Sequence, residues 1–356
     1  MATKSFPTIH LSPAIATMAL GSASAGHSLL EKIRIAALHS FKGVEVYFGC
    51  LEAHAYATAG VVDHQSLLQA AVETKEVCDQ NGISVVCLQP FLFFDGLTSD
   101  SARIDAFKRL RLWFNISHAL GTDLIQIPTN FQQHDTTGDL GRIVEDLKEA
   151  ADLGLKESPP VRLAYEGVSW GTHIDTWETT WEVVKRANMS NLGICIDTFH
   201  IAAKAWGDPT SAFGCLQNGE ARLTATLERM TQELDPQKIF YIQIGDAEKL
   251  SPPLGPGHEF WDEKMPPRMS WSRNSRLFPF ENEGYLPIGR ILAILVQHIG
   301  YCGWASMEIF NRKLFGGDPT IPEQYARRAK QSWALTIRFL EKEHDNDRAR
   351  KAVTAL

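Results

Sequence analysis

Four polar side chains follow four apolar runs that have the composition of buried β-strands. They are Glu166 in VRLAYE, Asp197 in LGICID, Gln243 in IFYIQI and Glu308 in WASMEIF. Their ligand atoms are oxygens, which suit hard divalent ions, whereas a structural zinc site uses thiolates and imidazoles. The pattern therefore predicts a site for a divalent cation such as Mg²⁺, Mn²⁺ or Co²⁺.

Each of these residues also has a simpler interpretation. A single carboxylate at the end of a strand often caps the next helix or pairs with a surface lysine. Four such groups at equivalent ends of successive strands are harder to explain in that way, because burying them without a counter-charge is costly. A metal ion supplies that charge, so we prefer the metal site.

A histidine and a lysine follow Asp197 at helical spacing. His200 lies three residues and Lys204 seven residues beyond Asp197, so one face of a helix would present all three. We expect His200 to act as a general base near the metal or, alternatively, to orient Asp197 by a hydrogen bond. Lys204 would face a substrate oxygen, and Glu166 is the alternative base.

The segment SWSRNSR, residues 270–276, contains two arginines close to aromatic residues. A guanidinium in a partly dry pocket suits bidentate recognition of a carboxylate. We expect Arg276, with Ser272 four residues earlier, to hold a substrate carboxylate, while one of the two arginines, Arg273 or Arg276, would be a solvated loop charge. Gln126 in DLIQIP either contacts substrate or satisfies loop amides.

The elements that must position these residues are eight apolar runs that alternate with longer amphipathic stretches, a pattern typical of strands followed by helices. Continuously apolar strands indicate a parallel sheet covered by helices. We prefer an α/β fold with a closed (β/α)8 TIM barrel over a doubly wound sheet. There are eight units, the candidate ligands come from the last four strands, and no GxGxxG follows the first strand. The expected strands are 15–20, 43–48, 83–89, 123–128, 161–166, 192–197, 239–244 and 304–310.

One long segment interrupts the alternation after the seventh strand. Residues 245–284 are rich in Pro, Gly, Trp and Arg, and a connection of this length in a compact domain is usually a functional lid or a disordered linker. Its aromatic residues favour an ordered lid. We expect a single TIM-barrel domain over residues 1–345, with this enlarged loop, and a charged C-terminal tail over residues 346–356.

The composition argues against several classes of protein. The 356 residues are 44% hydrophobic and 22% charged, which is globular. A net charge of −7 argues against nucleic-acid binding, and no run has the character of a membrane span or a secretion signal. Six scattered cysteines without a CxxC pair indicate reduced, buried thiols. We expect a cytoplasmic protein with a small-molecule partner, and a homo-oligomer is left open.

Several motifs resemble one superfamily of metal-dependent barrels. The segments GVEVYFGCLEAHA, GISVVCLQPFLFFDGL, LAYEGVSWGTHIDTWE, GICIDTFHIAAKAWGDP and SWSRNSRLFPFENEGYLP are similar to those of xylose isomerase-like sugar phosphate isomerases and epimerases. Among these, they resemble the fungal 3-dehydroshikimate dehydratases. The resemblance covers most of the chain. It assigns the ion to Glu166, Asp197, Gln243 and Glu308, and substrate contacts to His200, Lys204, Ser272 and Arg276.

The resemblance implies a hydro-lyase that dehydrates 3-dehydroshikimate, a carboxylated cyclic compound, to protocatechuate in quinate and shikimate breakdown. One alternative is a ketose isomerase or epimerase of the same fold, with Glu166 and Glu308 as acid and base. Another is a non-catalytic sugar-acid binding protein. The carboxylate clamp favours the lyase. Bacterial relatives carry an arginine in the turn after strand three, where this chain has QPFLFFDG, so a second carboxylate contact is lost or supplied elsewhere.

Overall fold

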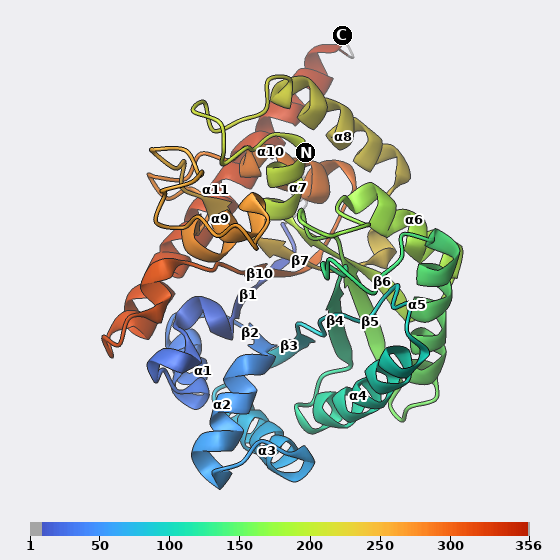
Figure 1. Cartoon of the computed structure of the whole chain (residues 1–356). Helices are drawn as coiled ribbons and strands as arrows, with labels where there is room; N and C mark the ends of the chain where they lie inside the picture. Colours follow the sequence, from blue (N-terminus) through green and yellow to red (C-terminus); the bar gives the residue numbers. More distant parts are fainter. Residues whose placement is uncertain (1–8, 355–356) are drawn as a thin grey trace, which may run out of the picture.

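Eight parallel strands close into a barrel in the computed structural model of the chain, which describes residues 9–354 (Figure 1). Around the barrel the strands follow the order β1, β10, β7, β6, β5, β4, β3, β2. This arrangement confirms the predicted TIM barrel. The strands are β1 (Leu11–Ala16), β2 (Gly43–Tyr47), β3 (Ser84–Gln89), β4 (Leu124–Pro128), β5 (Arg162–Glu166), β6 (Leu192–Asp197), β7 (Ile239–Ile244) and β10 (Gly303–Met307).

Helices surround the barrel on its outer side (Figure 1). Several begin at a short polar side chain that accepts a hydrogen bond from the first turn: Asp63 before α3, Asp139 before α5 and Thr176 before α6. The helices are α1 (Leu29–Leu38), α2 (Phe48–Ala59), α3 (His64–Gln80), α4 (Asp100–Ala119), α5 (Leu140–Leu155), α6 (Trp177–Ala187), α7 (Thr198–Ala205), α8 (Gly219–Glu233), α9 (Pro267–Ser275), α10 (Ile288–Ala293) and α11 (Ile321–Thr354).

The inside of the barrel is packed with side chains rather than open. A small cluster of buried residues fills it: Ala14, Val86, Cys87, Leu124, Ala164, Cys195 and Tyr241. A much larger apolar core lies between the strands and the surrounding helices. Because both faces of each strand are covered, the strands are mostly apolar, as the sequence pattern predicted. Polar side chains at the strand ends therefore stand out as the exception.

The long segment after β7 is ordered. It contains α9 and a two-residue antiparallel pair, β8 (Asp246–Ala247) with β9 (Arg276–Leu277). Trp271 of α9 is fully buried and donates its indole N–H to the carbonyl of Glu248 at 2.9 Å. Trp271 thus anchors the segment, which is ordered as expected. Its role as a lid stays a prediction.

Two details differ from the sequence-based expectations. The first strand ends at Ala16, because residues 17–20 form a 3₁₀ turn (η1, Thr17–Leu20). The cysteines are all free, but Cys302 is exposed and Cys215 is half-buried rather than buried. α11 continues to Thr354, residues 355 and 356 lie outside the described part, and the division into a domain and a charged tail stays a prediction.

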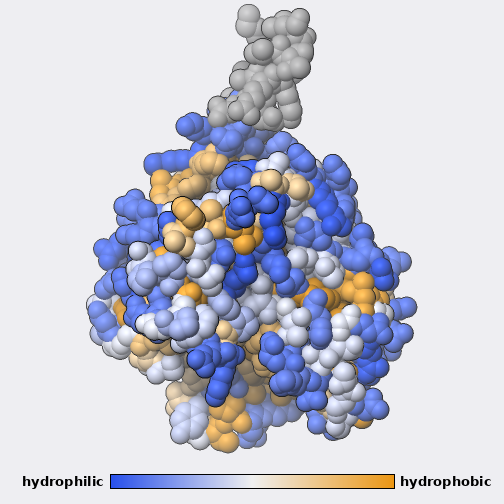
Figure 2. Space-filling model, turned by 45° about the horizontal axis from the view of Figure 1, so that its top comes forward, coloured by the Kyte–Doolittle hydropathy of each residue, from blue (hydrophilic) through white to orange (hydrophobic). Residues whose placement is uncertain are grey.

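The surface has the character expected of a protein in water. Hydrophilic residues dominate the face in Figure 2, with apolar patches scattered among them. Among the described residues, no helix combines the length and the hydrophobicity needed to cross a membrane.

A buried aspartate ties three strand ends together. Asp95, in the loop after β3, accepts hydrogen bonds from the backbone N–H of Asn130 (3.1 Å) and the hydroxyl of Tyr165 (3.0 Å). These partners lie after β4 and on β5, beside the predicted site. Burial raises the pKa of Asp95 from its ordinary value of 3.8 to about 7. The carboxyl therefore holds a proton in the fold at a pH where the unfolded chain has lost it.

This proton makes stability depend on pH. Because the folded pKa lies above the unfolded one, the contribution of Asp95 to the free energy of unfolding is complete below about pH 4 and is lost as the pH rises through about 7. Between about pH 5 and pH 8 the free energy of unfolding of the wild type should fall by about 1–3 kcal/mol more than that of Asp95→Asn. Urea unfolding of both proteins across this range measures the difference. Parallel curves would contradict the assignment.

Candidate active site

The four predicted ligands meet at one end of the barrel. Glu166 and Asp197 end β5 and β6, Gln243 is the penultimate residue of β7, and Glu308 directly follows β10. The strand register pairs Asp197 with Gln243, and Gln243 with Ser306. All four predicted ligands are at most 4% exposed. The fold therefore brings together residues that are up to 142 positions apart (308 − 166).

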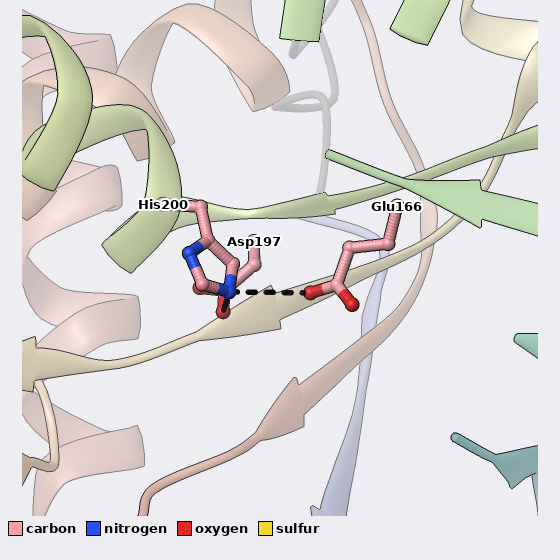
Figure 3. A group of neighbouring side chains, drawn as sticks. All are labelled: Glu166, Asp197 and His200. Atoms are coloured by element: carbon pink, nitrogen blue, oxygen red, sulfur yellow. Dashed lines mark ion pairs between the residues drawn. The ribbon is translucent and has the colours of Figure 1, made fainter. Parts of the chain in front are cut away.

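Glu166, Asp197 and His200 form a tight group at this end (Figure 3). Nε2 of His200 lies 3.5 Å from Oδ2 of Asp197 and 3.7 Å from Oε1 of Glu166. Asp197 also caps α7 by accepting a hydrogen bond from the N–H of Phe199 at 2.7 Å. The helix therefore begins at the ligand, and its first turn carries His200 back to the carboxylates, as the spacing predicted.

The ring of His200 lies between donors on both sides. The backbone N–H of Ser169 donates to Nδ1 at 3.1 Å, and the Ser169 hydroxyl lies 3.2 Å from the same atom. Nη2 of Arg276 lies 3.1 Å from Nε2. Burial, and then the charge of Arg276, lower the pKa of His200 well below its ordinary value, so the ring is neutral. A neutral imidazole has one acceptor nitrogen, so the two donors compete for it.

Arg276 is the cation that contacts the carboxylates. Its Nη1 donates to Asp197 (2.8 Å) and Glu308 (3.1 Å), and its Nε donates to Ser272 Oγ (2.8 Å). The residue is 1% exposed, and its guanidinium lies over the ring of Phe199. The predicted pairing of Ser272 with Arg276 is present. However, four of the five N–H groups of the guanidinium point at protein atoms.

Negative charge exceeds positive charge in this cluster. Glu45 of β2 is fully buried beside the other acids, and its Oε1 has no hydrogen-bond partner among the described residues. Burial and the repulsion of neighbouring carboxylates raise the pKa of Glu166 well above its ordinary value. Burial also raises the pKa of Glu308 to about 8, although Arg276 opposes the shift.

One arginine cannot balance these acids, and their donor atoms are mostly oxygen. A divalent cation bound by the carboxylates would supply the missing charge without leaving a buried group unpaired. The residues present therefore fit the predicted metal. Mg²⁺, Mn²⁺ and similar ions share this preference for oxygen ligands.

Gln243 bridges two of the acids through hydrogen bonds. Its Nε2 donates to Glu45 at 2.8 Å and to Glu308 at 3.0 Å, while Sγ of Cys195 lies 3.4 Å from its Oε1. In this arrangement the amide turns its nitrogen, not its oxygen, to the carboxylates. Binding a cation through Oε1 requires a half-turn of the amide, so the predicted ligand is in place but differently oriented.

Two further amides contact the acids. Gln126 donates to Glu166, which places this predicted substrate contact at the site, in direct contact with a predicted ligand. Gln89, at the end of β3, donates to Glu308 at 2.8 Å. Both amides fix a carboxylate, so Gln126 reaches a substrate only through its remaining amide atoms.

Lys204 does not join the cluster. Its ammonium pairs with Asp175 in the loop after β5, and it lines a neighbouring cavity with Arg222 and Thr226. His200 also lines this neighbouring cavity, so the helix face presents His200 and Lys204 together, but the ammonium contacts Asp175 and not the carboxylates of the cluster. A contact of Lys204 with substrate stays a prediction. Asp175 lies 22 residues before Asp197, so no local spacing predicts the pair.

A cavity of about 540 Å³ opens above the acids, a size typical of small-molecule sites. Glu166, His200 and Glu308 line it together with Ser272, and aromatic side chains form much of the remaining wall: Tyr47, Phe131, Trp170, Phe310 and Phe315. Two arginines, Arg273 and Arg276, also line it. The arrangement can hold a small anionic ring close to a base and a cation site.

Ser169 is a site residue that the sequence analysis missed. It lies three residues beyond Glu166 in the loop after β5, and it contacts His200 through both its N–H and its hydroxyl. The available sequence signal was its closeness to a strand end that carries a predicted ligand. Its partner is 31 residues away, so only the fold shows the contact.

A closed parallel barrel with acids at the carboxyl ends of its last strands defines a TIM-barrel protein with an enzyme-type site. The family model described as xylose isomerase-like TIM barrel matches residues 33–342. The chain belongs to this family.

Curated relatives share one name. The chain is 38% identical to a 3-dehydroshikimate dehydratase of Neurospora crassa, over 92% of this chain and 94% of that protein. It is 27% identical to a 3-dehydroshikimate dehydratase of Pseudomonas aeruginosa over 82% of this chain, which is 38% of that longer protein.

Solved structures share the fold. A xylose isomerase-like TIM barrel/4-hydroxyphenylpyruvate dioxygenase fusion protein has a TM-score of 0.72 at 24% identity, covering 95% of this chain and 44% of that one. A D-psicose 3-epimerase of Clostridium cellulolyticum H10 has a TM-score of 0.59 at 16% identity, covering 93% and 99%. At these identities the likeness concerns the barrel, not the reaction.

Loss of Arg276 should destabilise the protein. Arg276→Met leaves Asp197 and Glu308 without their counter-charge, and breaking a buried ion pair costs about 3–5 kcal/mol. Urea unfolding in the presence of a chelator measures this cost without interference from bound ions. Ser272→Ala removes one hydrogen-bond partner and should cost about 1 kcal/mol. Equal costs for the two variants would contradict the charge-balancing role of Arg276.

Proposed function

We propose that this chain is a metal-dependent hydro-lyase that converts 3-dehydroshikimate to protocatechuate, which is 3,4-dihydroxybenzoate. The observation that carries the proposal is the buried group of Glu166, Asp197, His200 and Glu308 under a cavity lined by arginines. The 38% identity to the Neurospora dehydratase supports the choice of substrate. A ketone, an adjacent acidic proton and a carboxylate are the features that such a site recognises.

Glu166, Asp197 and Glu308 would hold the ion, with Gln243 as the fourth ligand after a half-turn of its amide. When bound, a divalent ion stabilises the negative charge that develops on the ketone oxygen during proton removal. The protein then has to bind the ring, orient it and move one proton.

His200 is the residue we assign to that proton. Its Nε2 faces the acids and carries a lone pair when the ring proton is on Nδ1. In that tautomer Nδ1 donates to the Ser169 hydroxyl and the Ser169 backbone N–H gives up its contact, while Nε2 exchanges its contact with Arg276 for the substrate proton. It takes the proton from the carbon next to the ketone, the C–H electrons form a double bond, and the hydroxyl on the following carbon leaves. Nε2 returns the proton to that hydroxyl, so water departs. The dienone then tautomerises to the aromatic catechol.

Glu166 is the alternative base. The raised pKa of its carboxyl, caused by burial and by the neighbouring acids, gives it the basicity that the role requires. It lies 3.7 Å from His200 Nε2, so the two groups compete for the same position. Replacing each in turn separates the two assignments.

The cellular setting follows from the reaction. A dehydratase of this kind would work in quinate and shikimate breakdown in the cytoplasm, on a small carboxylated cyclic substrate. The net charge of −7 supports a role without nucleic acid.

An assay with dehydroshikimate distinguishes the candidate functions. The lyase produces ultraviolet absorbance from the catechol product, and the absorbance should disappear with a chelator and return with added divalent ion. A ketose isomerase or epimerase forms no aromatic product, and a binding protein forms no product at all. A wild-type protein that is loaded with metal and yields no protocatechuate would rule out the proposal.

Metal and activity should be lost together when a ligand is replaced. Asp197→Asn and Glu308→Gln each remove a negative charge from the site, and we expect product formation to fall at least about a hundredfold. Metal analysis of the same samples should show loss of the ion. Asp152→Asn, at an exposed position on α5, is the matched control and should change neither. Full turnover without bound metal would contradict the ligand assignment.

Replacing His200 should affect the proton transfer and not the ion. His200→Ala is expected to retain metal and to lower kcat by about 10²–10⁴-fold, the usual contribution of a general base. Ser169→Ala, which removes the hydroxyl that accepts the ring proton, should lower kcat less. An unchanged kcat in His200→Ala would leave Glu166 as the base.

A further inference from the structure

The cavity contains a positively charged side chain that the proposed reaction does not use. Arg273 lies in the last turn of α9 and lines the same cavity as Glu166 and Glu308. Its side chain is exposed. Within the described part of the chain it makes no ion pair and no side-chain hydrogen bond. Arg273 therefore offers a free guanidinium to a bound anion.

Arg276, three residues further on, is in the opposite situation. Its guanidinium is buried, and contacts with Ser272, Asp197, Glu308 and His200 leave one N–H group for a ligand. A bidentate contact to a carboxylate needs two parallel N–H groups. Arg276 makes this contact only by giving up its present contact with Ser272, His200 or a carboxylate of the protein.

The floor of the cavity decides which end of the substrate lies deepest. Glu166 and Glu308 line the floor, and the ion that they would hold under the proposed function stabilises charge on the ketone oxygen. A ring with a ketone and a carboxylate on different carbons then turns the ketone to the floor and the carboxylate outward. The outward end meets Arg273.

We infer that Arg273 binds the carboxylate of the substrate at the open end of the cavity, an assignment that rests on the proposed function. Although the side chain is exposed, the surrounding protein removes part of its water and lowers the pKa of the guanidinium. The phenol of Tyr47, which also lines the cavity, acts on the same charge. A partly desolvated arginine binds a carboxylate more strongly than a fully hydrated one.

Steady-state kinetics with dehydroshikimate test the assignment. In the metal-loaded protein, Arg273→Met should raise KM about 10- to 100-fold, as expected for the loss of a charge-assisted hydrogen bond, while kcat changes little. Arg273→Lys keeps the positive charge but loses the paired N–H groups of the guanidinium, and should give an intermediate KM. Arg34→Met is the control: Arg34 is an α1 arginine paired with Glu31, and its loss should leave KM unchanged.

Ligand binding tests the same contact without turnover. Calorimetric titration compares 3,4-dihydroxybenzoate with catechol, which lacks the carboxylate. The wild type should prefer the benzoate, and Arg273→Met should lose about 10- to 100-fold of that preference while catechol affinity stays the same. A preference that persists in Arg273→Met overturns the inference, as does an unchanged KM. If the wild type forms no product, but its preference for the benzoate disappears in the Arg273→Met variant, the proposed function fails and the carboxylate site stands.

Discussion

The balance of buried charge is the constraint on which the rest of the site depends. Four acids, Glu45, Glu166, Asp197 and Glu308, are buried at one end of the barrel, and the raised pKa values of their carboxyls show that the fold disfavours their ionisation. Arg276 offsets part of this charge. A cation bound by their oxygens would offset the rest, so metal binding and the shape of the site are linked.

The same arginine joins the long segment to the barrel. Arg276 belongs to β9, near the end of the segment, which pairs with β8 at its start, just after β7. Its side chain reaches Asp197 on β6 and Glu308 after β10. The segment is therefore held at the site by an ion pair as well as by the buried Trp271. A change of charge among the acids would alter the contact that holds the segment in place.

Sequence periodicity was sufficient to predict the barrel, because each strand is buried on both faces and each helix on one. It was also sufficient to predict that Glu166, Asp197 and Glu308 converge, since parallel strands align their carboxyl ends, but it did not place Glu45 of β2 beside them. It missed α2 and α9, whose sequences lack a clear apolar stripe. It did not predict that the ammonium of Lys204 pairs with Asp175, a residue 29 positions away. Contacts of this kind are fixed by loops, and loop geometry is not encoded in local spacing.

The two arginines of SWSRNSR show the same limit and its consequence for function. Sequence spacing favoured Arg276 as the carboxylate clamp, and its distance of four residues from Ser272 was correct. The spacing did not predict that α9 ends at Ser275. Arg276 therefore belongs to β9 and its side chain is buried, whereas Arg273 stays on the helix. One arginine then balances the acids, while the other faces the cavity unpaired. If Arg273 binds the carboxylate, as we infer, the cationic opening orients an anionic ring with its carboxylate outward. A local positive charge of this kind can attract an anion to a protein whose net charge is −7.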